Sequence, residues 1–142
     1  MCFTEENSRC EKNQKIIVSK DKGETREHRA INPEGKFDVR QYNLDGDILK
    51  QTKTCDFLLL NDTQKKAYLI ELKGKKIDNA IDQLLASERF CKKYFPDYMF
   101  LYRIVCSKAK TAKINNSKVL KFKAKYPGLV KIKEIKLVEQ LD

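Results

Sequence analysis

The sequence predicts a single α/β domain with a central mixed sheet flanked by helices. Three apolar runs, at residues 57–60, 67–72 and 98–106, are nearly continuous, as in strands that are covered on both faces. Between the second and third runs, the apolar residues of segment 77–95 recur at helical spacing in one stripe. The chain has 142 residues, which suffices for one domain with its own buried core.

The N-terminal segment gives the weakest pattern. Residues 1–14 are polar and without a clear period, which is compatible with a short helix or with a loose end. A brief apolar run at residues 16–18 precedes the turn-like sequence Asp21-Lys22-Gly23. Residues 26–36 then read as a loop, with a proline and a glycine as breakers.

Residues 36–51 read as a hairpin that opens the central sheet. Its apolar residues alternate with polar ones, and Asp45-Gly46 is the dipeptide favoured by two-residue type I′ turns. The return strand runs toward Cys55. Further along the chain, Pro96 ends the amphipathic helix, because proline cannot continue an α-helix.

The C-terminal part, residues 107–142, adds a basic helix and a strand to a core of roughly residues 37–106. The helix is expected over residues 117–126. Residues 129–141 read as one final strand with lysines along one side, as at the edge of a sheet.

The charge balance points to a polyanionic partner. Lysine and arginine total 30 against 20 aspartate and glutamate, a formal charge of +10, which favours nucleic acid. Segment 108–125 holds seven lysines and no acid, and it reads either as a phosphate-tracking surface or as an ordinary solvated face. Phe122 and Tyr126 are candidates for stacking on bases or for the core. The seven lysines are Lys108, Lys110, Lys113, Lys118, Lys121, Lys123 and Lys125.

Composition disfavours several other classes of protein. Five cysteines without a CxxC pair, with one histidine, disfavour a structural zinc site and indicate reduced thiols. The N-terminus lacks the apolar stretch of a signal peptide, and no segment is apolar over the length of a membrane span. We therefore expect a cytoplasmic protein that does not enter a membrane.

Two acidic residues fall where the apolar strands end. If Leu60 pairs with Ala67 across the polar loop between them, the antiparallel register places Asp56 opposite Glu71. Directly opposed residues have Cβ atoms about 4.5–5.5 Å apart. Lys73 lies two residues beyond Glu71 and therefore on the same face of the strand.

Such a pair of carboxylates is suited to a divalent cation. Two close carboxylates repel each other, and a cation between them removes the conflict. Oxygen ligands of this kind suit Mg²⁺ or Mn²⁺, with the carbonyl of Leu72 as a further ligand. Lys73 could then orient the attacking water or stabilise the charge that develops on a phosphate. The plain alternative is that Asp56, Glu71 and Lys73 are exposed charges at strand ends.

This pattern resembles the PD-(D/E)xK nucleases, which include many restriction enzymes, archaeal Holliday-junction resolvases and RecB-type exonuclease domains. Cys55-Asp56 stands for the "PD" half, with cysteine in place of proline, and Glu71-Leu72-Lys73 stands for the "ExK" half. The resemblance implies a restriction-endonuclease-like αβββαβ core and a metal-dependent phosphodiesterase site. By the same resemblance, Asp56 and Glu71 would bind the metal and Lys73 would assist the nucleophile.

The resemblance suggests further positions on the flanking helices. RecB-like members carry a Gln-x-x-x-Tyr motif on the helix after the lysine, and this chain has Gln83 there, with Ser87 in place of tyrosine. Gln83 is therefore a candidate residue of the catalytic site, either in contact with phosphate or supporting the residues that are, or it is an ordinary helix-surface glutamine. Many members also place an acid on a first helix. The candidates for that acid are Glu5, Glu6, Glu24 and Glu27.

Two alternative assignments concern neighbouring residues. Asp47 competes with Asp56, because resolvase-like members often have a glycine before their aspartate. We prefer Asp56, which lies on the strand paired with the Glu-x-Lys strand. His28, with Arg26 and Arg29, is a candidate phosphate contact or an exposed loop histidine.

Together these patterns predict a Mg²⁺-dependent endonuclease or exonuclease that acts on DNA. A chain this short offers little surface for reading sequence, so structure-selective or weakly specific cleavage is expected. A homodimer is expected by analogy with the superfamily. The alternative is a non-catalytic protein that binds nucleic acid or another partner and retains the nuclease-like fold.

Overall fold

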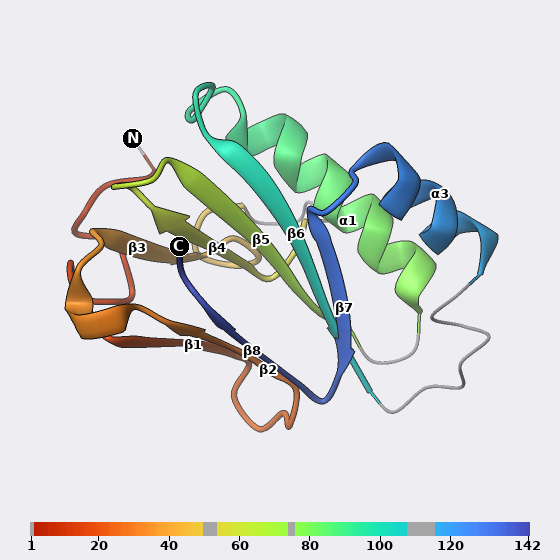
Figure 1. The fold of residues 1–142 in the computed structure, drawn as a ribbon, viewed down its shortest axis with the longest axis horizontal. Coiled ribbons are helices and arrows are strands. Elements are labelled where there is room, and N and C mark those ends of the chain that lie inside the picture. The colour runs from red at the N-terminus through yellow and green to blue at the C-terminus, as the bar shows by residue number, and fades with distance from the viewer. Residues whose placement is uncertain (1, 50–53, 74–75, 108–115) are drawn as a thin grey trace.

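The computed structural model describes residues 2–49, 54–73, 76–107 and 116–142, with residue 73 by its backbone alone. Over these residues the chain forms a mixed α/β architecture, as predicted, with two sheets and two α-helices (Figure 1). Neither helix is long and apolar enough to cross a membrane. The elements are β1 (Ile16–Lys20), β2 (Glu27–Ile31), the 3₁₀ turn η1 (Pro33–Gly35), β3 (Val39–Asn43), β4 (Phe57–Asn61), β5 (Lys66–Lys73), α1 (Ile77–Cys91), β6 (Met99–Cys106), α3 (Ser117–Lys125), β7 (Val130–Glu134) and β8 (Lys136–Gln140).

The larger sheet has five strands in the order β3-β4-β5-β6-β7. β3, β4 and β5 form an antiparallel meander, and β6 and β7 then add in parallel. α1 and α3 are the two crossover helices that parallel neighbours require. The order β3-β4-β5-α1-β6 is thus three strands, a helix and a fourth strand along the chain.

The two faces of this sheet are covered differently. α1 and α3 lie on one face, and a three-stranded sheet of order β1-β2-β8 lies on the other (Figure 1). Ile17, Ala30 and Leu137 of the smaller sheet join Tyr68 and Leu101 in one buried cluster. The sheet predicted to be flanked by helices thus has helices on one face and a second sheet on the other. The leading helix of the predicted core is wrong for residues 2–38, which give two strands and η1 instead.

The segments that form the smaller sheet, near both ends of the chain, have a different secondary structure from the one expected from the sequence. Segment 26–36, expected to be a loop, contains β2, which buries His28 and Ala30 on alternate positions. The single strand expected over residues 129–141 is broken at Ile135 into β7 and β8, which belong to different sheets. β2 pairs with β8 in parallel, so the smaller sheet joins the two ends of the described chain.

The hairpin expected at Asp45-Gly46 is also wrong. β3 pairs with β4, which begins at Phe57, rather than with a strand directly after the turn. Leu44 and Leu49 close a short turn instead, in which the N–H of Leu49 donates to the carbonyl of Leu44 at 2.8 Å. A turn dipeptide specifies a local reversal, but the buried apolar run of β4 determines which strand pairs with β3.

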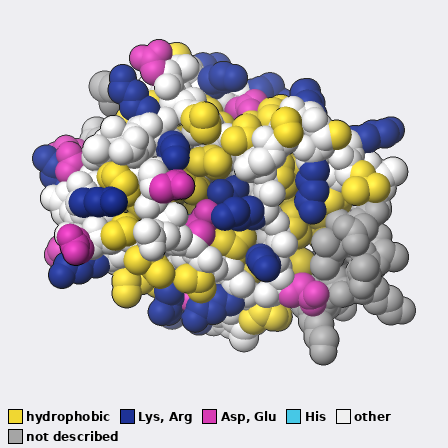
Figure 2. All heavy atoms as spheres, in the orientation of Figure 1, with side chains coloured by type: hydrophobic (Ala, Val, Ile, Leu, Met, Phe, Trp, Pro, Cys, Tyr) yellow, Lys and Arg dark blue, Asp and Glu magenta, His cyan; other side chains and the backbone are white. Residues whose placement is uncertain are grey.

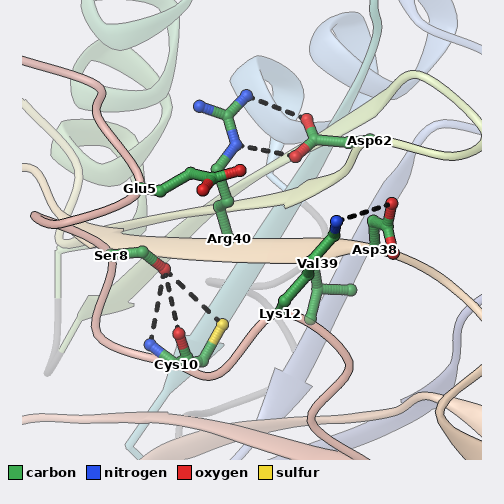
Figure 3. A pocket seen from close by; sticks show the side chains of 8 residues that line it. All are labelled: Glu5, Ser8, Cys10, Lys12, Asp38, Val39, Arg40 and Asp62. Carbon is green, nitrogen blue, oxygen red and sulfur yellow. Dashed lines mark hydrogen bonds and ion pairs between the residues drawn. The ribbon is translucent and has the colours of Figure 1, made fainter.

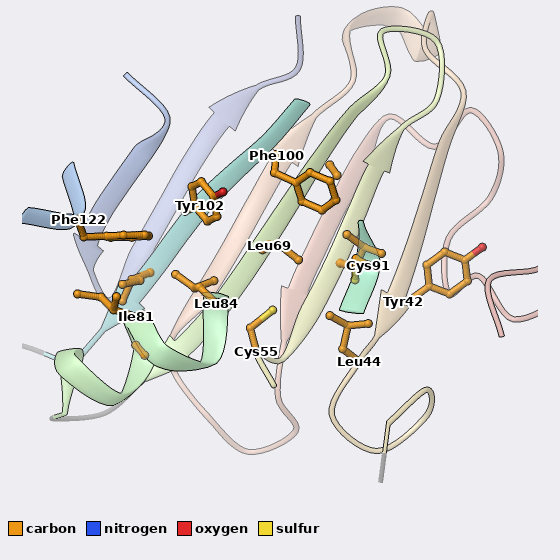
Figure 4. Close-up of a cluster of buried hydrophobic side chains, with 14 of the residues drawn as sticks. Tyr42, Leu44, Cys55, Leu69, Ile81, Leu84, Cys91, Phe100, Tyr102 and Phe122 are labelled. Carbon is orange, nitrogen blue, oxygen red and sulfur yellow. The ribbon is translucent and has the colours of Figure 1, made fainter. Parts of the chain in front are cut away.

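The helix-side core confirms the predicted apolar stripe of α1. Ile81 and Leu84 of α1 are buried beside Leu69 of β5 and Tyr102 of β6 (Figure 4). The helix ends at Cys91, before the predicted end at residue 95. Burial of the apolar face of α1 therefore fixes the position of this helix on the sheet, as its amphipathic sequence requires.

A buried ionic cluster joins the two sheets. Arg103 of β6 donates to both carboxylate oxygens of Glu139 of β8, at 2.7 and 3.0 Å. His28 Nε2 of β2 lies 2.6 Å from the same carboxylate. Burial alone would raise the pKa of Glu139, but hydrogen bonds from His28 and Arg103 lower it to about 2. Glu139 is therefore a carboxylate held charged inside the protein.

The turn from β7 to β8 has an unusual backbone. Ile135 has φ 66°, in the left-handed region that β-branched residues rarely adopt. Its N–H donates to the carbonyl of Cys106 at 2.8 Å, and its carbonyl accepts from the N–H of Glu27 at 3.0 Å. Holding a non-glycine residue in this conformation costs roughly 1–3 kcal/mol.

Candidate functional site

One edge of the larger sheet collects the predicted site residues. β4 runs antiparallel to β5, so the start of β4 and the end of β5 lie at the same edge. The predicted register is confirmed, with Leu60 opposite Ala67 and Phe57 opposite Ile70. Asp56 directly precedes this ladder, and one further step of the same register would set it opposite Glu71.

The two carboxyl groups occupy different environments at this edge. Glu71 is 2% exposed and shares the helix-facing side of β5 with Leu69. Asp56 directly precedes β4, and its Oδ2 accepts the backbone N–H of Leu72 at 2.8 Å. The Asp56 side chain thus takes the place of a backbone acceptor and is fixed against the end of β5.

Burial and neighbouring acids make Asp56 a weak acid. Burial, together with the charges of Asp21 and Asp45, raises its pKa to about 6. Hydrogen bonds to the N–H of Leu72 and to the Glu71 side chain act in the opposite direction. A carboxyl group whose ionisation is opposed in this way gains the most when a cation binds beside it.

Asp21 is an acid that the sequence analysis missed. It follows β1, and burial, Asp45 and Glu24 all raise its pKa. Its charge acts on Asp56, so the acid that reaches the site from the N-terminal side comes from the end of a strand rather than from a helix. The signal in the sequence was an acid directly after the apolar run 16–18, which we interpreted only as a turn residue.

The four acids proposed for that role have other surroundings. Glu24 pairs with Arg26 at 3.1 Å, and Glu27 pairs with Arg29 at 3.2 Å. Glu5 and Glu6 are exposed in a turn near the N-terminus. Asp47, the alternative to Asp56, is exposed and pairs with Arg9 at 2.8 Å.

A pocket of about 380 Å³ lies near Glu5 (Figure 3). Its wall includes Arg40, which donates to both carboxylate oxygens of Asp62 at 2.7 and 2.9 Å. Asp62 follows the far end of β4, so this pocket lies at the edge of the sheet opposite to Asp56. The pocket is therefore separate from the candidate site.

Gln83 and Ser87 on α1 hold the segment that leads into Asp56. Gln83 Nε2 donates to the carbonyl of Thr54 at 3.2 Å. Ser87 Oγ accepts the N–H of Cys55 at 2.8 Å and donates to the carbonyl of Gln83 at 2.8 Å. Both side chains therefore act on the backbone before Asp56, which is a positioning role distinct from the catalytic role predicted for Gln83.

Replacing Ser87 by alanine should destabilise the protein. Ser87 is buried, and the change leaves the N–H of Cys55 without its acceptor, at a cost of about 1–3 kcal/mol in the free energy of unfolding. Chemical denaturation measures the effect. Ser117→Ala is the matched control, because Ser117 is exposed at the start of α3. Equal stability of both variants and the wild type would contradict the positioning role.

The remaining predicted ligands have defined backbone positions. Leu72 donates its N–H to Asp56, and its side chain packs on the face toward the smaller sheet. Lys73 ends β5 and pairs in register with Cys106 of β6, while its side chain lies outside the described residues. Among the described residues, no three His, Cys, Asp or Glu side chains come together as metal ligands. Mg²⁺ sites commonly use one or two carboxylates with water and substrate phosphate, so Asp56 and Glu71 fit that chemistry.

The predicted lysine surface falls into three parts. Lys108, Lys110 and Lys113 lie outside the described residues. Lys118 pairs with Asp82 at 2.9 Å. The other three lysines are exposed on α3, namely Lys121, Lys123 and Lys125. On the face drawn in Figure 2, lysine and arginine side chains are spread among acidic and apolar ones.

The two aromatic residues near these lysines belong to the packing between α3 and the sheet. Phe122 is buried, and its ring lies 5.3 Å from that of Tyr102 of β6. The Tyr126 ring lies 4.7 Å from the same tyrosine. Of the two roles considered, core packing therefore applies to both residues, rather than stacking on bases.

Comparison with protein-family models, with curated proteins and with solved structures finds no match to this chain. The functional argument therefore depends on the residues and their geometry alone.

Proposed function

We propose that this protein is a metal-dependent nuclease that hydrolyses phosphodiester bonds in DNA. The observation that carries the proposal is the placement of Asp56 beside Glu71 at the ends of two buried neighbouring strands, with Lys73 closing the second strand. Folding alone does not require two acids at the end of an apolar sheet, since burying a carboxylate is unfavourable.

The chemistry of these residues supports a Mg²⁺ or Mn²⁺ site. Asp56, Glu71 and the carbonyl of Leu72 would hold the ion, which supplies a polarised phosphate and an activated water. Asp56 would be deprotonated with the ion bound, because the charge of the ion offsets the burial and the neighbouring acids that raise its pKa. Lys73 would orient the attacking water and stabilise charge on the phosphate.

The charge of the chain supports a nucleic-acid substrate. Its formal charge is +10, and Lys121, Lys123 and Lys125 are exposed on α3. Contacts of this kind bind phosphates without reading sequence, and they make affinity fall with added salt. This charge pattern agrees with cleavage that is weakly specific or that selects a DNA structure. Either a single copy of the chain or a homodimer fits this expectation.

A cleavage assay tests the proposal directly. Supercoiled, linear and branched DNA, and RNA of the same sequence, are each incubated with the protein in the presence of Mg²⁺, Mn²⁺ or a chelator. We expect DNA cleavage with either metal and none with the chelator. Tight DNA binding without cleavage would overturn the proposal and favour the non-catalytic alternative, and cleavage of RNA alone would correct the substrate.

The raised pKa of Asp56 predicts a pH-dependent stability that metal reverses. The carboxyl of Asp56 has a pKa of about 6 in the folded protein and ordinarily one of 3.8. At a pH below 3.8 its protonated form therefore stabilises the fold. That contribution of about 2–3 kcal/mol is lost as pH rises through 6. Without metal, Asp56→Asn should therefore melt at a higher temperature than the wild type at about pH 8, but not at about pH 4.

Adding Mn²⁺ at the higher pH should raise the melting temperature of the wild type and leave that of Asp56→Asn unchanged, because ligand binding to the folded state stabilises it. Asp47→Asn is the control, since Asp47 pairs with Arg9 outside the site. A melting temperature of Asp56→Asn that follows the wild type at every pH would contradict the assignment.

A further inference from the structure

Ile135 combines three features that folding does not explain together. Its backbone is in the left-handed region, its side chain is branched at Cβ, and it is 43% exposed. Glycine or asparagine would adopt this conformation at lower cost. Because the side chain is only partly buried, its packing does not account for the choice of isoleucine. Strained residues of this kind often mark functional positions.

The turn that carries Ile135 lies beside the candidate site. The N–H of Ile135 donates to the carbonyl of Cys106, and Cys106 is the register partner of Lys73. Figure 1 shows the turn from β7 into β8 next to the end of β6. Adjacent strands are about 4.8 Å apart, so Ile135 lies roughly 10 Å from Lys73. That distance corresponds to only a few nucleotides along one strand of a bound nucleic acid.

Both cationic and acidic residues lie beside this apolar tip. Lys133 and Lys136 flank the turn and are exposed, as is Glu134 directly before Ile135. Arg26 reaches the same end of the sheet, where its Nη1 donates to Ser107 Oγ at 2.9 Å. Cations beside an apolar side chain suit a nucleic-acid strand, because phosphates bind the cations while bases contact the apolar group.

We propose that Ile135 is a specificity-determining residue that contacts a base near the scissile phosphate and thereby favours DNA whose bases are unpaired there. This inference rests on the proposed nuclease function. In a fully paired duplex the base faces are covered by stacking, whereas an unpaired base exposes its face to an apolar side chain. The strained backbone holds the side chain outward, at the end of the sheet where the strands β5 and β6 stop.

The test compares kcat/KM for a forked DNA with that for a blunt duplex of the same sequence. The wild type should prefer the fork. Ile135→Gly should lower kcat/KM on the fork about tenfold, which corresponds to the free energy of burying part of an isoleucine side chain. It should leave kcat/KM on the duplex nearly unchanged. Ile135→Leu, which keeps an apolar side chain, should retain the preference. Met99→Ala is the control, because Met99 is 52% exposed at the opposite end of β6.

Thermal melting separates this role from a structural one. Ile135→Gly should melt no lower than the wild type, because glycine relieves the positive φ. An equal preference for the fork in the wild type and Ile135→Gly, or equal losses on both substrates, would overturn the inference while the nuclease function stands. A wild type that cleaves neither substrate with either metal would overturn the proposed function and this inference with it.

Discussion

Replacing Glu71 by glutamine should lower metal-dependent cleavage by roughly 100- to 1,000-fold. Glutamine has nearly the same shape, but it lacks the negative charge that would hold the cation with Asp56. The position is 2% exposed, and glutamine keeps a polar side chain of nearly the same size there. The variant should therefore fold about as stably as the wild type, and its lost activity is then a loss of chemistry. Initial rates with saturating Mn²⁺ and supercoiled DNA measure the effect.

Two further variants determine whether the loss is specific. Lys73→Ala should cause a similar fall in rate while DNA binding persists, because the lysine is proposed to act on the attacking water. Asp47→Asn should cleave like the wild type, since Asp47 pairs with Arg9 on the surface. Loss of activity in Asp47→Asn with full activity in Glu71→Gln would instead assign the metal to the alternative acid.

Replacing Arg103 by methionine should produce the largest loss of stability. Arg103 fills the space between the two sheets and donates to both oxygens of Glu139. Its removal leaves the Glu139 carboxylate buried with His28 as its remaining partner inside the protein. Breaking a buried ion pair from one side costs about 3–5 kcal/mol. Urea denaturation near neutral pH measures the change in the free energy of unfolding.

The matched control for this change is Lys131→Met. Lys131 Nζ lies 3.5 Å from the same carboxylate, but its side chain is 52% exposed. Its removal should change stability by less than about 1 kcal/mol, because exposed ion pairs contribute little. A loss in Lys131→Met as large as in Arg103→Met would contradict the buried cluster as the main link between the sheets.

The same cluster predicts how acid affects the wild type. The pKa of Glu139 is about 2 in the folded protein and 4.5 ordinarily. Its stabilisation, about 3 kcal/mol, is present above pH 4.5 and is lost as pH falls toward 2. In Arg103→Met this part of the acid dependence should become smaller.

Sequence reasoning succeeded where the pattern was local. The pairing of Leu60 with Ala67 followed from two apolar runs and the short loop between them. The stripe of α1 followed from helical spacing in one segment. In both cases the residues that determine the structure lie close together in the chain, so the period of apolar residues is sufficient.

It failed where distant segments decide the outcome. β2 was read as a loop because Pro33 and Gly35 follow it, and its inward residue His28 has its partner Glu139 111 residues away. Asp21 was missed for a related reason, because its proximity to Asp56 depends on the packing of the smaller sheet against the larger one. The single final strand was wrong because Ile135 turns the chain from one sheet to the other, a change that the lysine pattern does not indicate.

The parallel pairing of β2 with β8 also sets an order of events during translation. β2 leaves the ribosome early, but its partner strand is synthesised only after β7. Contacts between distant segments form slowly, because a long loop must close first. The smaller sheet is therefore complete only after β8 has emerged. Until nearly the whole described sequence has been made, Arg103 and His28 in a nascent chain are thus without Glu139, the carboxylate with which they pair in the folded protein.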